Sequence, residues 1–399
     1  MAQEALLKSI LVDLQQGPSG HGISFPKAYQ NPEDEGFVIP WHHRLATINV
    51  ALTGRCNLRC PCCYKDLDGK EIPLDRMLHT IDRLHEAGWG TTIMLAGGEP
   101  MLYKGLYDVI KHARGYGMEV YLGTNGTLLN EKNVAKLAEA DVSKVCIGVD
   151  PSLVEKPDKD PRAYEKTIRA FGRLRDKGVP NLANLIVTHQ NVDIVPEMIE
   201  VLLSEGADGI NLLRPKPQKV GNWIDDSRLT WQDIKKLQWT FASCRRKQME
   251  VWIDCSLGML LEGMPRDLII EEDPTPSCCA GIDYCSIEQD GSIVACPDLK
   301  GAQFVAGNIL TSNLDEVWKD GRSFRELRAP RDYSGSCGEC YLKNQCGGCR
   351  AVALAEGDLN QADPDCPKGH ESKLGRLWRR TRFLTQLAIS NLAKKSPDA

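Results

Sequence analysis

The sequence has few of the features that mark a membrane, secreted or nucleic-acid-binding protein. Its 399 residues contain no run of about 18 apolar residues, so no transmembrane helix is predicted. The formal net charge of −5 gives no indication of a nucleic-acid partner. The first residues, Met-Ala-Gln-Glu-Ala-Leu-Leu, lack the basic-then-apolar order of a signal peptide. We therefore expect a cytoplasmic protein with no membrane partner.

Cysteine is the residue that this chain has in abundance. With 42% hydrophobic and 26% charged residues, the composition is that of a globular protein of two or three domains. Sixteen cysteines in a large cytosolic chain indicate metal binding rather than disulfides. Thirteen of them fall in two clusters, at 56–63 and 278–366. We interpret the other three, Cys146, Cys244 and Cys255, as core or incidental thiols.

The first cluster has the spacing Cys-x3-Cys-x2-Cys, formed by Cys56, Cys60 and Cys63. Three thiolates on one loop suit iron–sulfur chemistry, and three ligands leave one iron of a four-iron cluster open to a small molecule. Cys62 could replace Cys63 as the third ligand, which would give the spacing Cys-x3-Cys-x-Cys. We favour Cys63. A zinc site is the other alternative, but it usually shows two Cys-x2-Cys pairs and this segment has one.

Strand-like and helix-like segments alternate from Leu45 onward. Apolar positions recur at steps of three or four in the helical segments, and glycines follow several of them. The alternation predicts an α/β fold with six parallel strands. The predicted strands are 45–52, 92–96, 119–124, 144–149, 182–188 and 209–213, and the predicted helices are 74–87, 106–116, 131–140, 163–177 and 195–204.

Polar and glycine-rich motifs follow the ends of these strands, where ligands bind in parallel α/β folds. The second strand ends in Gly97-Gly98-Glu99-Pro100, in which glycines allow close backbone approach and the carboxylate can accept a hydrogen bond from an ammonium group. Asn125 follows the third strand and Asp150 the fourth. His189 and Asn191 follow the fifth and Arg214 the sixth, with ligand contact and a packing or capping role left open.

The cysteine spacing, the Gly-Gly-Glu-Pro motif and the six units together resemble the radical S-adenosylmethionine (radical SAM) superfamily. The resemblance implies a partial (β/α)6 TIM barrel and a [4Fe-4S] cluster on Cys56, Cys60 and Cys63, with S-adenosylmethionine (SAM) on its open iron. The implied SAM contacts are Gly97, Gly98, Glu99, Pro100, Asn125 and Asp150. Gly148 and Pro151 depart from the Ser-x-Asp-Gly pattern of the relatives, which leaves the contact by Asp150 unproven.

The second cysteine cluster resembles the SPASM extension of radical SAM enzymes, in the branch of the pyrroloquinoline quinone, mycofactocin and heme pathways. It contains Cys337-x2-Cys340-x5-Cys346-x2-Cys349 and a later Cys366. The resemblance implies two auxiliary [4Fe-4S] clusters, the second held by Cys337, Cys340, Cys346 and Cys366. The first would use Cys279, Cys296 and Cys349, with Cys285 as the fourth ligand, and with Cys278 or an open iron as the alternatives. A zinc ribbon is the less favoured reading of the same spacing.

The expected function is a radical SAM oxidoreductase that abstracts hydrogen from a C–H bond, most simply of a ribosomally made peptide. A tetrapyrrole or sugar-type small molecule is the alternative substrate. The expected partners are an external electron donor such as flavodoxin or ferredoxin and a separate peptide-recognition protein. No general acid or base is assigned, although Asp298 lies two residues after Cys296.

Five segments are expected along the chain. They are an N-terminal extension (1–44), the partial barrel (45–225), a bridge (226–275), the auxiliary-cluster domain (276–370) and a C-terminal helix or tail (371–399).

Overall fold

A curved sheet surrounded by helices forms the centre of the computed structural model. The structure describes residues 46–60, 63, 65–150, 162–217, 227–261, 264–269, 278–299, 301–329, 332–340 and 346–370. Within these residues ten strands form one sheet, in the order β10-β9-β8-β1-β2-β3-β4-β5-β6-β7. The N-terminal extension and the C-terminal helix expected from the sequence lie outside the described residues.

The six predicted strands are present, and each is parallel to the next. They are β1 (Thr47–Thr53), β2 (Thr92–Gly97), β3 (Glu119–Thr124), β4 (Lys144–Val149), β5 (Asn181–Ile186) and β6 (Ile210–Leu213). Their fully buried positions are apolar, as in Ile48, Ile93 and Val145. In β2, β5 and β6 buried and partly exposed residues alternate, so one face of these strands is more fully covered than the other.

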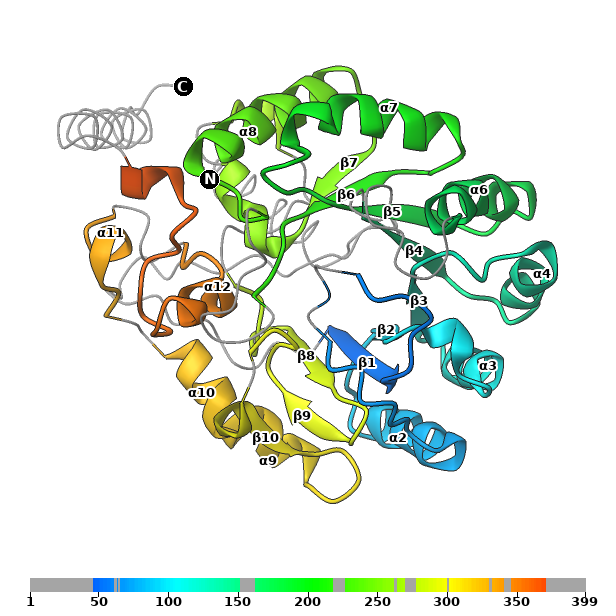
Figure 1. The fold of residues 1–399 in the computed structure, drawn as a ribbon. Helices are drawn as coiled ribbons and strands as arrows, with labels where there is room; N and C mark the ends of the chain where they lie inside the picture. The colour runs from blue at the N-terminus through cyan, green and yellow to red at the C-terminus, as the bar shows by residue number, and fades with distance from the viewer. Residues whose placement is uncertain are drawn as a thin grey trace, which may run out of the picture.

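Helices cover the outer face of this sheet (Figure 1). They are α2 (Leu74–Glu86), α3 (Leu106–Gly115), α4 (Glu131–Glu139), α6 (Ala163–Asp176), α7 (Val195–Ser204) and α8 (Trp231–Arg246). In α2 the buried residues Met77, Ile81 and Leu84 recur at helical spacing and face the strands. Helix α8 begins with a capping box between Thr230 and Asp233. The partial TIM barrel predicted from the sequence is confirmed.

Two further parallel strands extend the barrel sheet beyond the six that were predicted. β7 (Val251–Ile253) pairs with β6, so part of the expected bridge belongs to the sheet. β8 (Tyr284–Ile287) pairs with β1 on the other edge, and the buried side chains of Asn49 and Ser286 are hydrogen-bonded across this pair at 2.9 Å. The cysteine-rich region is therefore joined to the barrel through backbone hydrogen bonds.

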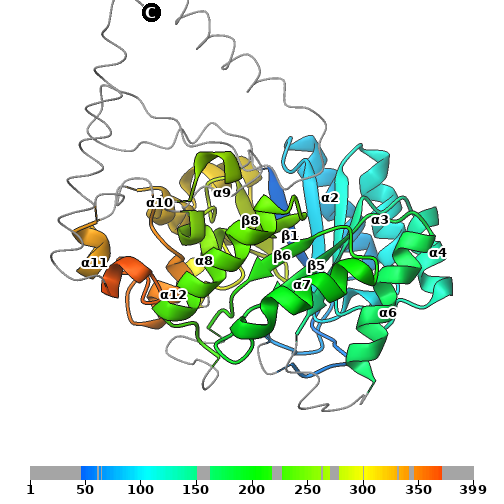
Figure 2. The ribbon, with the colours of Figure 1, turned by 90° about the horizontal axis from the view of Figure 1, so that it is seen from above.

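The C-terminal elements lie on the side of the barrel away from α3 and α4, as both views show (Figures 1 and 2). They are the antiparallel β9 (Ser292–Val294) and β10 (Val305–Asn308), then α9 (Leu314–Asp320), α10 (Arg322–Arg328), α11 (Gly335–Gly338) and α12 (Arg350–Ala355). No helix in the described part of the chain is both long enough and apolar enough to cross a membrane.

Candidate active site and cluster sites

The loop that follows β1 carries Cys56, Cys60 and Cys63. Cys56 and Cys60 are partly buried against Leu58 and Ala163. The Leu58 amide donates to Cys56 Sγ at 3.4 Å. Burial, followed by the charges of Asp150, Cys63 and Cys56, raises the pKa of Cys60 to about 12. The three predicted cluster thiols are thus mutual neighbours, whereas Cys62 lies outside the described residues.

The Gly97-Gly98-Glu99 turn after β2 is bonded to the start of this loop. The Gly98 amide donates to the Thr53 carbonyl at 2.6 Å, and the Glu99 amide donates to the Arg55 carbonyl at 2.7 Å. A Cβ atom on Gly98 would lie 2.2 Å from the Arg55 oxygen, and Gly97 has a positive φ of 125°. Only glycine allows this approach of the two backbones.

The Glu99 carboxylate is fully buried at the ends of β2 and β3. It accepts hydrogen bonds from Thr124 Oγ1 at 2.7 Å, from the Asn125 amide at 2.8 Å and from the Met101 amide at 3.0 Å. Burial raises the pKa of Glu99 above its ordinary value, although these hydrogen bonds oppose the rise. The arrangement keeps a carboxylate in a low-dielectric position next to the cysteine loop.

Asn125 and Asp150 lie at the same edge of the sheet. The Asn125 side chain donates to Asn57 Oδ1 at 2.9 Å and lies 4.0 Å from Cys56 Sγ. Asp150 is buried after β4, and its charge contributes to the raised pKa of Cys60. Pro100 begins the short 3₁₀ helix η1 (Pro100–Leu102). The predicted SAM contacts therefore surround the loop.

These residues fit the groups that the sequence implies. The three thiols are soft ligands that suit iron, and the raised pKa values of Cys56 and Cys60 fall when a cation binds. The buried Glu99 carboxylate can pair with an ammonium group, and the two glycines leave room beside it. Across the described residues, no three His, Cys, Asp or Glu side chains converge as the ligands of a single metal ion would.

A second group of thiols gathers around α11 and the loop before α12. Burial raises the pKa of Cys346 to about 11, and the charges of Cys337 and Cys340 add to the rise. Burial also raises the pKa of Cys366 to about 12, with smaller contributions from Cys346 and Cys337. The structure thus brings together the four residues predicted for the second auxiliary cluster.

A third group lies between the barrel and α12. Burial raises the pKa values of Cys296 and Cys349, and the charge of Cys278 adds to the rise in each. The sulfur of Cys278 accepts from the amide of Arg350, the first residue of α12, and Cys349 is the residue before it. Cys279 lies beside Cys278, with its Sγ 3.5 Å from Cys255 Sγ.

Cys285, predicted as the fourth ligand, is not brought to this group. It lies inside β8 opposite Ile48 and is fully buried, and burial alone raises its pKa. Its position in the strand points it into the apolar core. The structure thus gives no support to that assignment.

Two family models match the chain. One, described as the radical SAM superfamily, matches residues 50–202, which include the cysteine loop and the Gly-Gly-Glu-Pro turn. The other, SPASM, described as an iron–sulfur cluster-binding domain, matches residues 278–341. The chain is a radical SAM enzyme with a SPASM domain.

Full-length relatives support the branch inferred from the cysteine spacing. The chain is 27% identical to the AdoMet-dependent heme synthase of Oleidesulfovibrio alaskensis, across 87% of this chain and 91% of the synthase. It is 26% identical to the PqqA peptide cyclase of Rhodopseudomonas palustris, across 83% and 88% of the two chains. The crystal structure of Streptococcus suis SuiB bound to S-adenosylmethionine matches 81% of this chain and 77% of SuiB with a TM-score of 0.65, which at 17% identity shows a shared fold.

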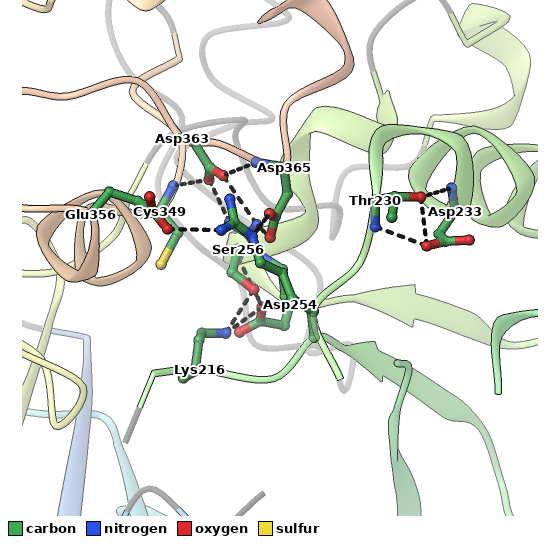
Figure 3. A network of polar contacts seen from close by, with 11 residues as sticks. Lys216, Thr230, Asp233, Asp254, Ser256, Cys349, Glu356, Asp363 and Asp365 are labelled. Atoms are coloured by element: carbon green, nitrogen blue, oxygen red, sulfur yellow. Dashed lines mark hydrogen bonds and ion pairs between the residues drawn. The ribbon is translucent and has the colours of Figure 1, made fainter. Parts of the chain in front are cut away.

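Three further residues at the mouth of the radical SAM barrel make structural contacts. His189 Nδ1 lies 2.7 Å from Asp233 in the capping box of α8, and Asn191 donates to the Ile186 carbonyl at 2.9 Å. Arg214 is buried and ion-paired with Asp363 and Asp365, the two carboxylates labelled in Figure 3. All three residues thus make packing or capping contacts within the protein.

Sequence reasoning missed Lys216 and Cys255, which the SPASM enzyme places next to its third thiol group. Lys216 follows β6 and Cys255 follows β7, and both contribute charge to the surroundings of Cys349 or Cys278. Neither belongs to a cysteine motif. The one signal in the sequence was a thiol within the largely apolar segment Val251–Leu261.

Proposed function

We propose that this protein reductively cleaves S-adenosylmethionine and abstracts hydrogen from a C–H bond of a peptide substrate. The observation that carries the proposal is the pair of backbone hydrogen bonds that fixes the Gly98–Glu99 turn against the Cys56 loop. When bound, the cluster and SAM supply a 5′-deoxyadenosyl radical, as the family resemblance implies. The chain's own residues bind the cluster and SAM, orient the substrate and exclude water from the site.

Each predicted residue has a place in this proposal. Cys56, Cys60 and Cys63 hold the cluster, and the Glu99 carboxylate accepts from the amino group of SAM. Gly97, Gly98 and Pro100 shape the turn, while Asn125 and Asp150 complete the polar edge around the ligand. Burial of Glu99 strengthens its attraction for an ammonium because the local dielectric is low.

Two auxiliary clusters are part of the proposal. Cys337, Cys340, Cys346 and Cys366 hold the second, and Cys296 and Cys349 contribute to the first together with a thiol of the Cys278–Cys279 pair. Hydrogen bonds from backbone amides to the sulfurs, such as that from Ala280 to Cys278, tune the potential of such clusters. Electrons would come from a flavodoxin- or ferredoxin-type donor, and a cytoplasmic location would keep the thiols reduced.

The peptide substrate is supported by the likeness to the PqqA peptide cyclase. A separate recognition protein would present the peptide. A tetrapyrrole is the second candidate, favoured by the likeness to the heme synthase over 87% of this chain. The two candidates predict different products from the same radical chemistry.

The test begins with anaerobic reconstitution and a chemical reductant. We expect about twelve irons per chain, from three four-iron clusters, and formation of 5′-deoxyadenosine from SAM. Mass spectrometry after turnover with peptides encoded beside the gene, and with porphyrin precursors, identifies the substrate class. Failure to form 5′-deoxyadenosine from the fully loaded protein would overturn the proposal. Turnover of porphyrin precursors but of no peptide would assign the second substrate instead.

A further inference from the structure

Cys255 is distant from every cysteine motif in the sequence, yet it lies among the thiols of the SPASM domain. It is the first residue of the 3₁₀ helix η3 (Cys255–Leu261), which follows β7. Its Sγ is 3.5 Å from Cys279 Sγ, and Cys279 is the donor in this contact. Since β7 is parallel to the other barrel strands, Cys255 is at the edge where their C-terminal ends meet.

The position of Cys255 is fixed from both sides by one lysine. Lys216 Nζ contacts Asp254 Oδ1 at 3.2 Å and Ser256 Oγ at 2.7 Å, as Figure 3 shows. The Ser256 amide also donates to Asp254 Oδ1, at 2.9 Å. Lys216 is largely buried, with 13% of its side chain exposed. Both neighbours of Cys255 are therefore held rigidly, as expected of a residue that binds rather than one that merely fills space.

The neighbouring thiols form one connected group around Cys278. After burial, the charge of Cys255 is the largest cause of the raised pKa of Cys278, so the two thiols are neighbours. The charge of Cys278 contributes in turn to the raised pKa values of Cys296 and Cys349. Cys279 contacts Cys255 and is also close enough to Cys278 for the two charges to interact. Four thiols on separate segments are thus neighbours near the start of α12, with a fifth positioned to donate a hydrogen bond.

We propose that Cys255 is the fourth thiolate of the first auxiliary cluster, together with Cys278, Cys296 and Cys349, and that Cys279 donates its S–H to Cys255. The proposal rests on the proposed function, in which this region holds a four-iron cluster. The four ligating thiols release their protons when they bind iron, and Cys279 keeps its own. Lys216 and Arg214, each ion-paired with a carboxylate, oppose the rise that burial causes in the pKa of Cys349.

Four thiolates leave no iron of this cluster open. The cluster would then transfer electrons, and it would not bind the substrate through iron. The S–H group of Cys279 would raise the reduction potential of this cluster. A hydrogen bond to a ligand sulfur stabilises the reduced cluster, which is the more negative state.

The test uses full-length protein in which Cys56, Cys60 and Cys63 are replaced by alanine, so that only auxiliary clusters are observed. Into this protein we introduce Cys255→Ala, Cys279→Ala or, as a control, Cys244→Ala in α8. Each protein is reconstituted, oxidised mildly with ferricyanide, and assayed for iron and by EPR. We expect Cys255→Ala to lose about one iron of the roughly eight present and to show the signal of a three-iron cluster.

The other variants decide between Cys255 and Cys279. We expect Cys279→Ala to keep all its iron but to have a lower reduction potential, and Cys244→Ala to match its parent. If Cys279→Ala instead gives the three-iron signal and Cys255→Ala does not, the proposal is wrong and Cys279 is the ligand. Should Cys255→Ala fail to fold, Cys255→Ser must still change the EPR spectrum, because oxygen replaces sulfur on one iron. A parent protein without auxiliary iron would instead overturn the proposed function itself.

Discussion

The guanidinium group of Arg214 lies 2.5 Å from the carboxylate of Asp363, and both side chains are almost completely buried. Arg214 follows β6 of the barrel, whereas Asp363 precedes the predicted cluster ligand Cys366. Asp363 also accepts the Cys349 amide at 2.9 Å, and Asp365 accepts from Arg214 at 2.8 Å and from Arg228 at 2.6 Å. One ionic network therefore links the barrel with both auxiliary thiol groups.

Replacing Arg214 with methionine should destabilise the protein by about 3–5 kcal/mol, because the buried Asp363 loses its counter-ion and Asp365 keeps only Arg228. Urea unfolding under anaerobic conditions measures the change. The control is Arg322→Met, which removes an exposed pair with Glu326 four residues along α10 and should change stability by less than about 1 kcal/mol. Equal effects of the two substitutions would show that the buried network contributes no more than a surface pair.

Replacing Gly98 with alanine should impair SAM binding and lower stability by about 1–3 kcal/mol, because the new Cβ would overlap the Arg55 carbonyl. Calorimetric titration and thermal unfolding provide the two measurements. Gly115→Ala in α3 is the matched control, since a Cβ there meets nothing within 4 Å. That control should be neutral or stabilising by up to about 1 kcal/mol, and unchanged SAM affinity in Gly98→Ala would refute the close-approach argument.

Replacing Glu99 with glutamine should weaken SAM binding by roughly 10- to 100-fold, since a hydrogen bond to a charged group contributes about 1.5–3 kcal/mol. Burial raises the pKa of Glu99, so the wild-type carboxylate takes up a proton at a higher pH than an exposed glutamate does. Affinity for the SAM ammonium should therefore fall as the pH is lowered through this raised pKa.

The glutamine variant has no carboxylate to titrate, and its affinity should not follow that pH dependence. Binding measured across the acidic to neutral range distinguishes the two curves. Glu131→Gln, at the exposed start of α4, should behave as the wild type does. Parallel pH curves for the wild type and Glu99→Gln would exclude Glu99 as the ammonium acceptor.

Replacing Cys56, Cys60 and Cys63 together with alanine should abolish 5′-deoxyadenosine formation and remove about four of roughly twelve irons. The auxiliary clusters should remain, because their thiols lie on other segments. Iron analysis and chromatography of the products measure both effects. Cys146→Ala, at a buried thiol within β4, serves as the control and should keep all its iron and its activity. Residual SAM cleavage in the triple variant would place the reactive cluster elsewhere.

Local patterns in the sequence were sufficient to predict the barrel and the loop that begins the chemistry. The third and fourth strands were predicted at Glu119–Thr124 and Lys144–Val149, the bounds that are observed. β7 was missed because it has only three residues, and so short an apolar run does not distinguish a strand from a buried turn. β8 was missed because its partner, β1, is far away along the chain.

The same limit explains the first auxiliary site. Spacing within a motif cannot reveal Cys255, which meets Cys279 only after β7 and the SPASM domain have folded together. It also cannot show that Cys285 occupies a strand position facing the core. In both cases the deciding information is a contact between distant segments.

The pairing of β1 with β8 has a consequence for how the protein is made. Asn49 of β1 and Ser286 of β8 are 237 positions apart along the chain. During synthesis, one edge of β1 therefore has no β8 to pair with until the region around residue 287 has left the ribosome. Unpaired strand edges favour association with other chains. The barrel half of this protein should accordingly depend on its cysteine-rich half for protection, and fragments that end before β8 should tend to aggregate.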